Sequence, residues 1–157
     1  MAFELNLQTD HVGHVRGATP PSFPPDVSIR KVIDTMQVER RGSAVVCDPD
    51  GKLIGIFTER DALRLLAAKS NLDLPIESVM AKEPVTVAES DTVGESVRRM
   101  ATGGYRRLPI VDGSNRPTGI VKATEILHYL VEHFPEFVYN LPPSPDQTNS
   151  QREGALG

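Results

Sequence analysis

The chain has 157 residues and a formal net charge of −4, and 39% of its residues are hydrophobic. This length fits one domain of ordinary size or two small ones, and the composition is in the globular range, so disorder of the whole chain is excluded. A chain of this size buries roughly two-thirds of its unfolded surface and needs no disulfide or metal to stabilise its core. The acidic balance argues against a strongly basic nucleic-acid-binding protein, and we expect no nucleic-acid partner.

Cysteine usage and hydropathy indicate the compartment. The only cysteine, Cys47, has no partner for an internal disulfide. No secretory apolar region follows Met1, so we expect a reducing, cytoplasmic location. No run of about 18 apolar residues is present, so we expect no membrane span. Aromatic residues make up 5% of the chain and tryptophan is absent, which leaves aliphatic and backbone groups to hold any base or sugar ring.

The sequence repeats itself. Shifted by 64 positions, the stretch Val12–Ala67 aligns without a gap onto Ile76–Val131. Identical pairs include Met36 with Met100 and Gly55 with Gly119. The repeat divides the chain into an N-terminal arm (residues 1–11), a first repeat (12–70), a second repeat (71–134) and a C-terminal tail (135–157). We expect a short strand or arm around Phe3, Leu5 and Leu7, and a largely disordered tail, because residues from 142 onward are rich in Pro, Ser, Gln and Asn.

Each repeat predicts the same order of elements, β-α-β-β-α. The first repeat predicts an extended stretch at 20–25, a helix with apolar residues at Ile29, Val32, Ile33 and Met36, strands at 44–47 and 53–57, and a second helix from about residue 62. The second repeat predicts an extended stretch at 84–88, a helix with Val93, Val97 and Met100, strands at 108–111 and 118–121, and a helix from about residue 126. Thr92 and Glu95 have the spacing of a helix capping box.

Two units of this kind predict an α+β fold of two pseudo-symmetric repeats. Each unit alone would expose one face of a three-stranded sheet, so we expect the two sheets to pack face to face, with clefts at their junction. The alternative is two independent domains on a linker. The connection at residues 70–75 is short and apolar for a free linker, and it favours the packed arrangement.

The first candidate site is the strand-to-helix junction Gly55–Asp61. Free N–H groups at a helix start favour an anion, the Thr58 hydroxyl can donate a hydrogen bond, and the Asp61 carboxylate can accept the two hydroxyls of a ribose. The same Thr-x-x-Asp spacing is also that of an ordinary helix cap. In the second repeat Lys122 stands where Thr58 stands in the first, so a side-chain cap is not essential for this helix to form.

The second candidate site is the stretch 103–109. Arg106 and Arg107 precede a strand, two glycines allow close backbone approach, and guanidinium groups match phosphate oxygens. The alternative is a solvated pair of surface cations. The equivalent residues of the first repeat are Gly42 and Ser43, so only the second repeat has cations here.

These features resemble a tandem pair of cystathionine β-synthase (CBS) domains. The resemblance rests on the repeated β-α-β-β-α order, on Gly55–Asp61 and its weaker copy Gly119–Glu125, and on the strand Arg107–Val111. It covers about residues 12–134. The resemblance implies a regulatory module that binds AMP, ADP, ATP or an S-adenosyl compound between the repeats, and a disc-like homodimer.

The resemblance also implies roles for individual residues. Asp61 would hold the ribose, Thr58 a phosphate or ribose oxygen, and Arg106 and Arg107 the phosphates. The adenine would be bordered by Val85, Thr86, Leu108 and Pro109. A second, weaker cleft would contain Lys122, Glu125, Gly42 and Ser43, where the family pattern of Thr, Asp and Arg is lost. We therefore expect one good site per chain.

Two other functions are weighed against this one. A non-catalytic dimerisation scaffold with a vestigial site is favoured by the degenerate second copy. An enzyme is disfavoured because no nucleophile–base pair is evident. We expect no cofactor and no metal. His11 and His14 form an H-x-x-H pattern that hints at a metal, but two exposed polar residues near a terminus are the favoured interpretation, and the spacing of His128 with His133 does not support a ligand set. No output domain is evident, so we expect the response to come from the homodimer or from an unidentified protein target.

Overall fold

The computed structural model describes residues 9–133; the expected N-terminal strand at Phe3–Leu7 and the tail from residue 134 lie outside them. The first half of the chain forms η1 (Val12–His14), β1 (Ser22–Phe23), α2 (Ile29–Val38), β2 (Ser43–Cys47), β3 (Leu53–Thr58) and α3 (Glu59–Ala67). The second forms η2 (Ile76–Ser78), β4 (Ala81–Lys82), β5 (Val87–Ala88), α4 (Val93–Gly103), β6 (Arg107–Val111), β7 (Pro117–Lys122) and α5 (Ala123–His133). None of the helices in this range is long and apolar enough to cross a membrane.

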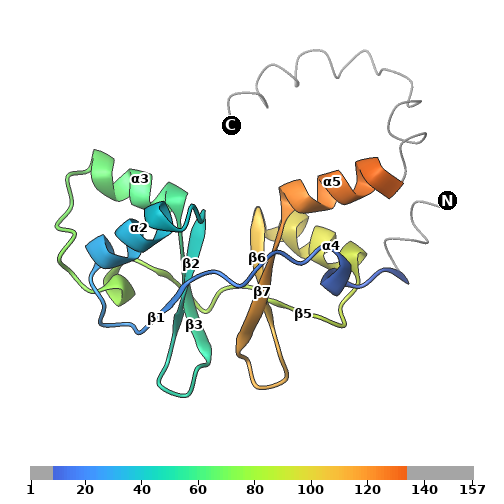
Figure 1. Ribbon diagram of the computed structural model, residues 1–157, viewed down its shortest axis with the longest axis horizontal. Helices are drawn as coiled ribbons and strands as arrows, with labels where there is room; N and C mark the ends of the chain where they lie inside the picture. The colour runs from blue at the N-terminus through green and yellow to red at the C-terminus, as the bar shows by residue number, and fades with distance from the viewer. Residues whose placement is uncertain (1–8, 134–157) are drawn as a thin grey trace, which may run out of the picture.

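The strands form two sheets, with the orders β1-β2-β3-β4 and β5-β6-β7. The sheets meet in the middle of the molecule and the helices lie on their outer sides (Figure 1). The 64-residue offset is reproduced in the register: Ser43 pairs with Thr58 in one sheet, and Arg107 with Lys122 in the other. Both antiparallel pairs also shift register at equivalent positions, Val46/Cys47 and Ile110/Val111. The predicted α+β fold of two β-α-β-β-α repeats is confirmed.

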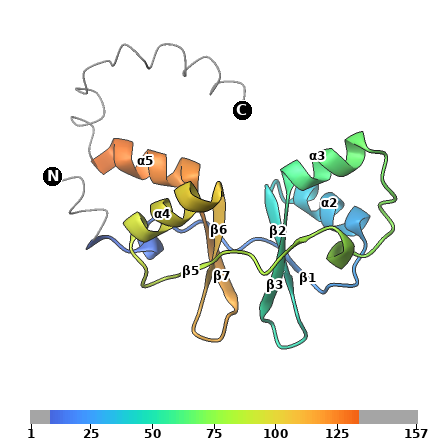
Figure 2. The same cartoon turned by 180° about the vertical axis from the view of Figure 1, so that it is seen from behind.

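In each half of the molecule, the first segment comes from the other repeat. The N-terminal segment crosses to the second half, where the Val12 N–H donates to the Asp91 carbonyl at 2.8 Å. In return, β4 of the second repeat pairs antiparallel with β3 of the first, with Ala81 opposite Ile56. The two crossing segments are visible in Figures 1 and 2. A sequence boundary at residues 70 and 71 therefore separates the repeats along the chain but does not separate the packed halves.

Each half has its own apolar core, built from one face of its sheet and the inner faces of its helices. Helix α2 begins at Ser28, whose hydroxyl accepts from the Lys31 N–H, and its periodic residues Ile29, Val32 and Met36 are buried. In α4, Thr92 caps the helix by accepting from the Glu95 N–H at 3.1 Å.

The expected capping box at the start of α4 is only half formed. The Glu95 carboxylate binds Arg98 and Arg99 on the exposed side of the helix rather than the cap. The hydrogen bond from Arg98, assisted by Arg99, lowers the pKa of Glu95 to about 2. Arg99 also donates to the Thr86 carbonyl, so it fixes the approach to β5.

A third apolar cluster joins the two sheets. Val45, Cys47 and Leu53 from the first sheet are buried together, and Val111 of the second sheet packs against them. Cys47 is 8% exposed and occupies the strand position equivalent to Val111, as the sequence predicts. Because apolar residues of both sheets are packed together in this cluster, it favours the packed pair over two separate domains.

The exchange of segments makes a prediction about stability. Ile76 belongs to the second repeat, yet its side chain is fully buried in the core of the first half. Replacing Ile76 by Ala should reduce the free energy of unfolding by about 2–5 kcal/mol, because a cavity would remain in that core. Urea denaturation measures this. Leu74→Ala, two residues earlier and 45% exposed, is the matched control and should change it by less than about 0.5 kcal/mol. A loss for Ile76→Ala as small as that of the control would contradict the exchange.

Candidate functional site

A cleft of about 600 Å³ lies between the two halves, where β3 runs into α3 and β7 runs into α5. Both halves contribute to its walls. The first half supplies Thr58 and Asp61, and the second supplies Arg106, Arg107 and Lys122. The volume is in the range of small-molecule sites.

Thr58 and Asp61 form a complete capping box at the start of α3. The Asp61 N–H donates to the Thr58 hydroxyl at 3.4 Å, and the Thr58 N–H donates to Asp61 Oδ2 at 2.9 Å. The Thr58 hydroxyl also donates to Oδ2 at 3.0 Å. Within residues 9–133, both hydrogen bonds to this carboxylate are made to Oδ2, which leaves Oδ1 to accept from a ligand. Capping and ligand binding are thus compatible roles for these two residues.

A left-handed turn brings the cationic segment into the cleft. Helix α4 ends at Gly104, whose φ of 71° is the left-handed conformation that glycine adopts without strain. The chain then passes Tyr105 and Arg106 and enters β6 at Arg107. The Arg107 guanidinium crosses to the other half and lies over Gly42, where a Cβ would come within 2.7 Å of its Cζ. A glycine at position 42 therefore makes room for this arginine.

The Arg107 guanidinium is incompletely paired. Its Nη2 reaches Glu59 Oε1 at 3.4 Å, but its Nη1 is buried without a hydrogen-bond partner in the described part of the chain. The side chain as a whole is 23% exposed. A charged group that has lost water and gained only one long contact favours an anion nearby.

Pro109 changes the backbone of the cleft relative to the first half. There, the Val45 N–H donates to the Pro21 carbonyl at 2.9 Å. The equivalent positions are Pro109 and Val85, and proline has no N–H to donate. The Val85 carbonyl is therefore not held by that bond, and both Val85 and Pro109 line the cleft.

The structure brings most of the predicted primary site together. Thr58, Asp61, Val85, Arg106, Arg107 and Pro109 all line the cleft. Two predicted residues do not line it: the Leu108 side chain is 1% exposed within the core of the second half, and the Thr86 carbonyl faces Arg99. Sequence reasoning missed further charged lining residues, namely Arg60, Arg64, Lys82 and Glu83. Their position in the sequence could have indicated them. Arg60 and Arg64 lie within three residues of Asp61, and Lys82 and Glu83 lie two or three residues before Val85.

The four residues expected in a second cleft do not converge. Lys122 lines the same cleft as Asp61, and Gly42 lies beneath the Arg107 guanidinium. Ser43 is 2% exposed, and Glu125 lines a different pocket. This differs from the sequence expectation because β7 places Lys122 directly opposite Arg107.

Arg41 is the 64-residue counterpart of Tyr105, which lines the cleft. Its Nη1 donates to the Thr19 carbonyl at 3.1 Å, and its Nη2 donates to the Ala18 carbonyl at 2.6 Å. These carbonyls are the 64-residue counterparts of Lys82 and Glu83, which line the first cleft. On this side of the molecule, the Arg41 guanidinium therefore binds the backbone carbonyls that correspond to part of the cleft wall.

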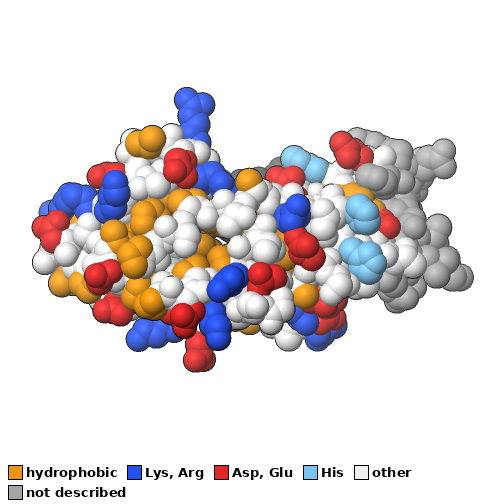
Figure 3. All heavy atoms as spheres, turned by 60° about the horizontal axis from the view of Figure 1, so that its bottom comes forward, with side chains coloured by type: hydrophobic (Ala, Val, Ile, Leu, Met, Phe, Trp, Pro, Cys, Tyr) orange, Lys and Arg blue, Asp and Glu red, His pale blue; other side chains and the backbone are white. Residues whose placement is uncertain are grey.

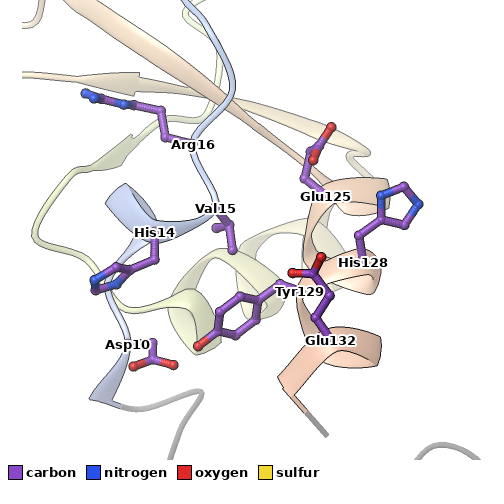
Figure 4. A pocket seen from close by; sticks show the side chains of 8 residues that line it. All are labelled: Asp10, His14, Val15, Arg16, Glu125, His128, Tyr129 and Glu132. Carbon is purple, nitrogen blue, oxygen red and sulfur yellow. The ribbon is translucent and has the colours of Figure 1, made fainter. Parts of the chain in front are cut away.

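Glu125 lines a pocket of about 590 Å³ between the N-terminal segment and α5. Figure 4 shows Asp10 and His14 on that segment opposite Tyr129 and Glu132 on α5, with Arg16 and His128 pointing away from its centre. Across residues 9–133, no group of three or more His, Cys, Asp or Glu side chains is placed to hold a metal ion. His11 instead has its Nδ1 within 2.9 Å of the Ser90 carbonyl oxygen.

Comparison with known proteins identifies the family. The sequence profile of the CBS domain matches residues 12–68 and 76–132, so the chain belongs to the CBS domain family, as the repeat and its motifs predict. Among its relatives, an uncharacterized 17.7 kDa protein of Acidianus ambivalens is 32% identical over 69% of this chain and 65% of its own length. An uncharacterized protein of Methanopyrus kandleri is 39% identical over 57% of this chain and 48% of its own length.

Solved structures share the fold. The CBS domain protein PAE2072 from Pyrobaculum aerophilum, complexed with AMP, has a TM-score of 0.69 and 25% identity, covering 78% of this chain and 98% of that one. The CBS domain pair of protein MJ0100, in complex with methylthioadenosine and S-adenosylmethionine, has a TM-score of 0.69 and 24% identity, covering 76% and 98%. At 24% identity, the similarity to the MJ0100 domain pair shows only that the fold is shared.

The capping box predicts a modest structural role for Thr58. Thr58→Ala should lower the free energy of unfolding by about 1 kcal/mol, since the helix start loses its acceptor. Thr58→Ser retains a hydroxyl and should recover most of this loss. Thermal or urea denaturation gives both values. Equal stability of the alanine and serine variants would show that the cap does not stabilise α3.

Proposed function

We propose that this chain is a regulatory module that binds one adenosine-containing ligand in the cleft between its two CBS repeats. The observation that carries the proposal is the shared cleft itself: a carboxylate from one half and two guanidinium groups from the other line a single hollow of about 600 Å³. The AMP complex of the related Pyrobaculum aerophilum protein supports an adenine nucleotide as the ligand class.

The groups in the cleft match the parts of a nucleotide. The free oxygen of Asp61 accepts from the ribose hydroxyls, and charge-assisted bonds of this kind are the stronger ones. Arg106 and Arg107 face the phosphates, where Arg107 Nη1 gains the partner it lacks in the described residues. The Val85 carbonyl accepts from the exocyclic amine of adenine, since Pro109 leaves it without the bond made in the other half.

The proposed role is binding rather than catalysis. Among residues 9–133, the cleft lining includes no histidine, cysteine or serine. The response to the ligand then comes from the homodimer or from a separate protein target. The single buried thiol of Cys47 fits the reducing cytoplasm that we propose as the location.

The alternative is a scaffold with a vestigial site, which the Arg41-filled second position favours. Ligand-induced stabilisation separates the two functions. A ligand held at 100 times its Kd stabilises the fold by about 2.7 kcal/mol. A scaffold would show no thermal shift with any adenosine compound.

The proposal predicts the effect of removing the Asp61 charge. Asp61→Asn should weaken binding of AMP or ATP by about one to two decades, because a charge-assisted hydrogen bond contributes about 1.5–3 kcal/mol. Isothermal titration calorimetry measures this, and wild type should show one ligand per chain. The matched control is Glu125→Gln, the equivalent position of the second repeat, which lies outside the cleft. Unchanged affinity in Asp61→Asn, or a loss in Glu125→Gln, would contradict the assignment.

The proposal includes a homodimer formed through α3 and α5. Both helices expose apolar residues at corresponding positions: Leu63 is 65% exposed and Leu127 is 59% exposed. These helices start beside the cleft, so a partner covering them would also be coupled to ligand binding.

Charge placed on both exposed faces should dissociate this dimer. Light scattering should give twice the 17.2 kDa chain mass for wild type and one chain mass for the double variant Leu63→Lys, Leu127→Lys. Val38→Lys on α2, where the side chain is 82% exposed, is the control and should remain dimeric. A monomeric wild type would exclude the dimer.

A further inference from the structure

We infer that the cleft selects an adenine nucleotide with two or more phosphates, and that Lys122 is the residue that reads the length of the phosphate chain. This inference rests on the proposed function and specifies its ligand. Lys122 ends β7 and lines the cleft together with Arg106 and Arg107.

The cleft concentrates positive charge in an acidic protein. Its lining contains three carboxylates, Glu59, Asp61 and Glu83, and six cations, Arg60, Arg64, Lys82, Arg106, Arg107 and Lys122. The chain as a whole has a net charge of −4. On the face shown in Figure 3, by contrast, cationic and acidic side chains are interspersed. A neutral nucleoside or a cationic S-adenosyl compound would leave the excess charge of the cleft without compensation, whereas a polyphosphate chain neutralises it.

The strand register places two of these cations in an unfavourable pair. Arg107 and Lys122 are Cα partners on the adjacent strands β6 and β7, and like charges directly opposite each other destabilise a sheet. The equivalent pair of the first half, Ser43 with Thr58, is neutral. The pair is relieved when an anion lies between its two cations.

The protein leaves donors of both cations unused, although Arg107 Nη2 is paired with Glu59. Lys122 has no side-chain hydrogen bond or ion pair to any of residues 9–133, and Arg107 Nη1 is buried without a partner. Lys122 also occupies the position of the helix cap, which Thr58 fills on α3, but an ammonium group cannot accept from the N–H groups of α5. The repulsion between Arg107 and Lys122 and their unused hydrogen-bond donors both favour the binding of phosphate oxygens beside them.

The other large pocket has the opposite charge. Asp10, Glu125 and Glu132 line the pocket beside α5, with Arg16 as its one permanent cation among the lining residues. Glu125 and His128 there are the counterparts of Asp61 and Arg64 in the cleft. Phosphate groups are therefore disfavoured at that pocket, and the polyphosphate site is specific to the cleft.

The test compares ligands that share the adenosine part and differ in charge. Calorimetry on the full chain should show ATP and ADP binding at least about tenfold more tightly than AMP, with adenosine and S-adenosylmethionine weaker still. Lys122→Gln should reduce the ratio of ATP to AMP affinity by about tenfold, the effect of losing one charge-assisted bond, while adenosine affinity stays constant. Lys122→Arg keeps the cation and should keep the ratio.

Lys52→Gln is the matched control, because Lys52 lies in the turn between β2 and β3, outside the cleft lining. Lys122→Gln should unfold at the wild-type temperature or above, since relief of the Arg107–Lys122 repulsion stabilises the unliganded sheet, and the other two variants should unfold near the wild-type temperature.

The outcomes separate this inference from the function on which it rests. If AMP or S-adenosylmethionine binds as tightly as ATP, and Asp61→Asn weakens that binding, the module function stands and the polyphosphate inference fails. If Lys122→Gln weakens adenosine and ATP equally, Lys122 does not read the phosphates and the inference also fails. If no adenine compound binds wild type, both the function and the inference are overturned.

Discussion

The contact between the two sheets is the constraint on which the rest of the molecule depends. Val45, Cys47 and Leu53 of the first half are buried, and Val111 of the second half packs against them. The exchange of first segments strengthens this contact, since each half completes its core with residues from the other repeat. The cleft exists because the strands β3 and β7, held side by side in this way, deliver two helix starts to the same place.

Near-symmetry of the fold explains why differences in a few side chains have a large effect. The backbone register of the two halves agrees position by position. What differs is chemistry: Arg107 replaces Ser43, Lys122 replaces Thr58, and Pro109 replaces Val45. Each change moves charge or an open acceptor toward one cleft. On the other side, the Pro21 carbonyl accepts from the Val45 N–H, and Arg41 binds the Ala18 and Thr19 carbonyls. One duplicated scaffold thus yields a single cationic site.

Much of this could be predicted from the sequence. The 64-residue repeat predicted the order of elements and the equivalence of Cys47 with Val111. The resemblance to CBS domain pairs implied that Asp61 and Arg107 approach each other from opposite repeats. The exchange of first segments could not be predicted, because Val12 and Ile76 are equally suited to either core. The position of Lys122 in the cleft could not be predicted because it depends on the pairing of β6 with β7. The contacts of Arg41 could not be predicted because they depend on the conformation of a long, flexible side chain. The burial of Leu108 follows from the side-chain alternation of β6, which turns Leu108 and Ile110 toward the core of the second half.

The central claim is that groups from opposite repeats bind one nucleotide in one cleft. A crystal structure of the chain grown with ATP tests it most directly. The account predicts a single nucleotide per chain, with its ribose on Asp61 and its phosphates between Arg107 and Lys122. A nucleotide bound beside α5 instead, or ordered crystals at saturating ATP with the cleft holding only solvent, would contradict it.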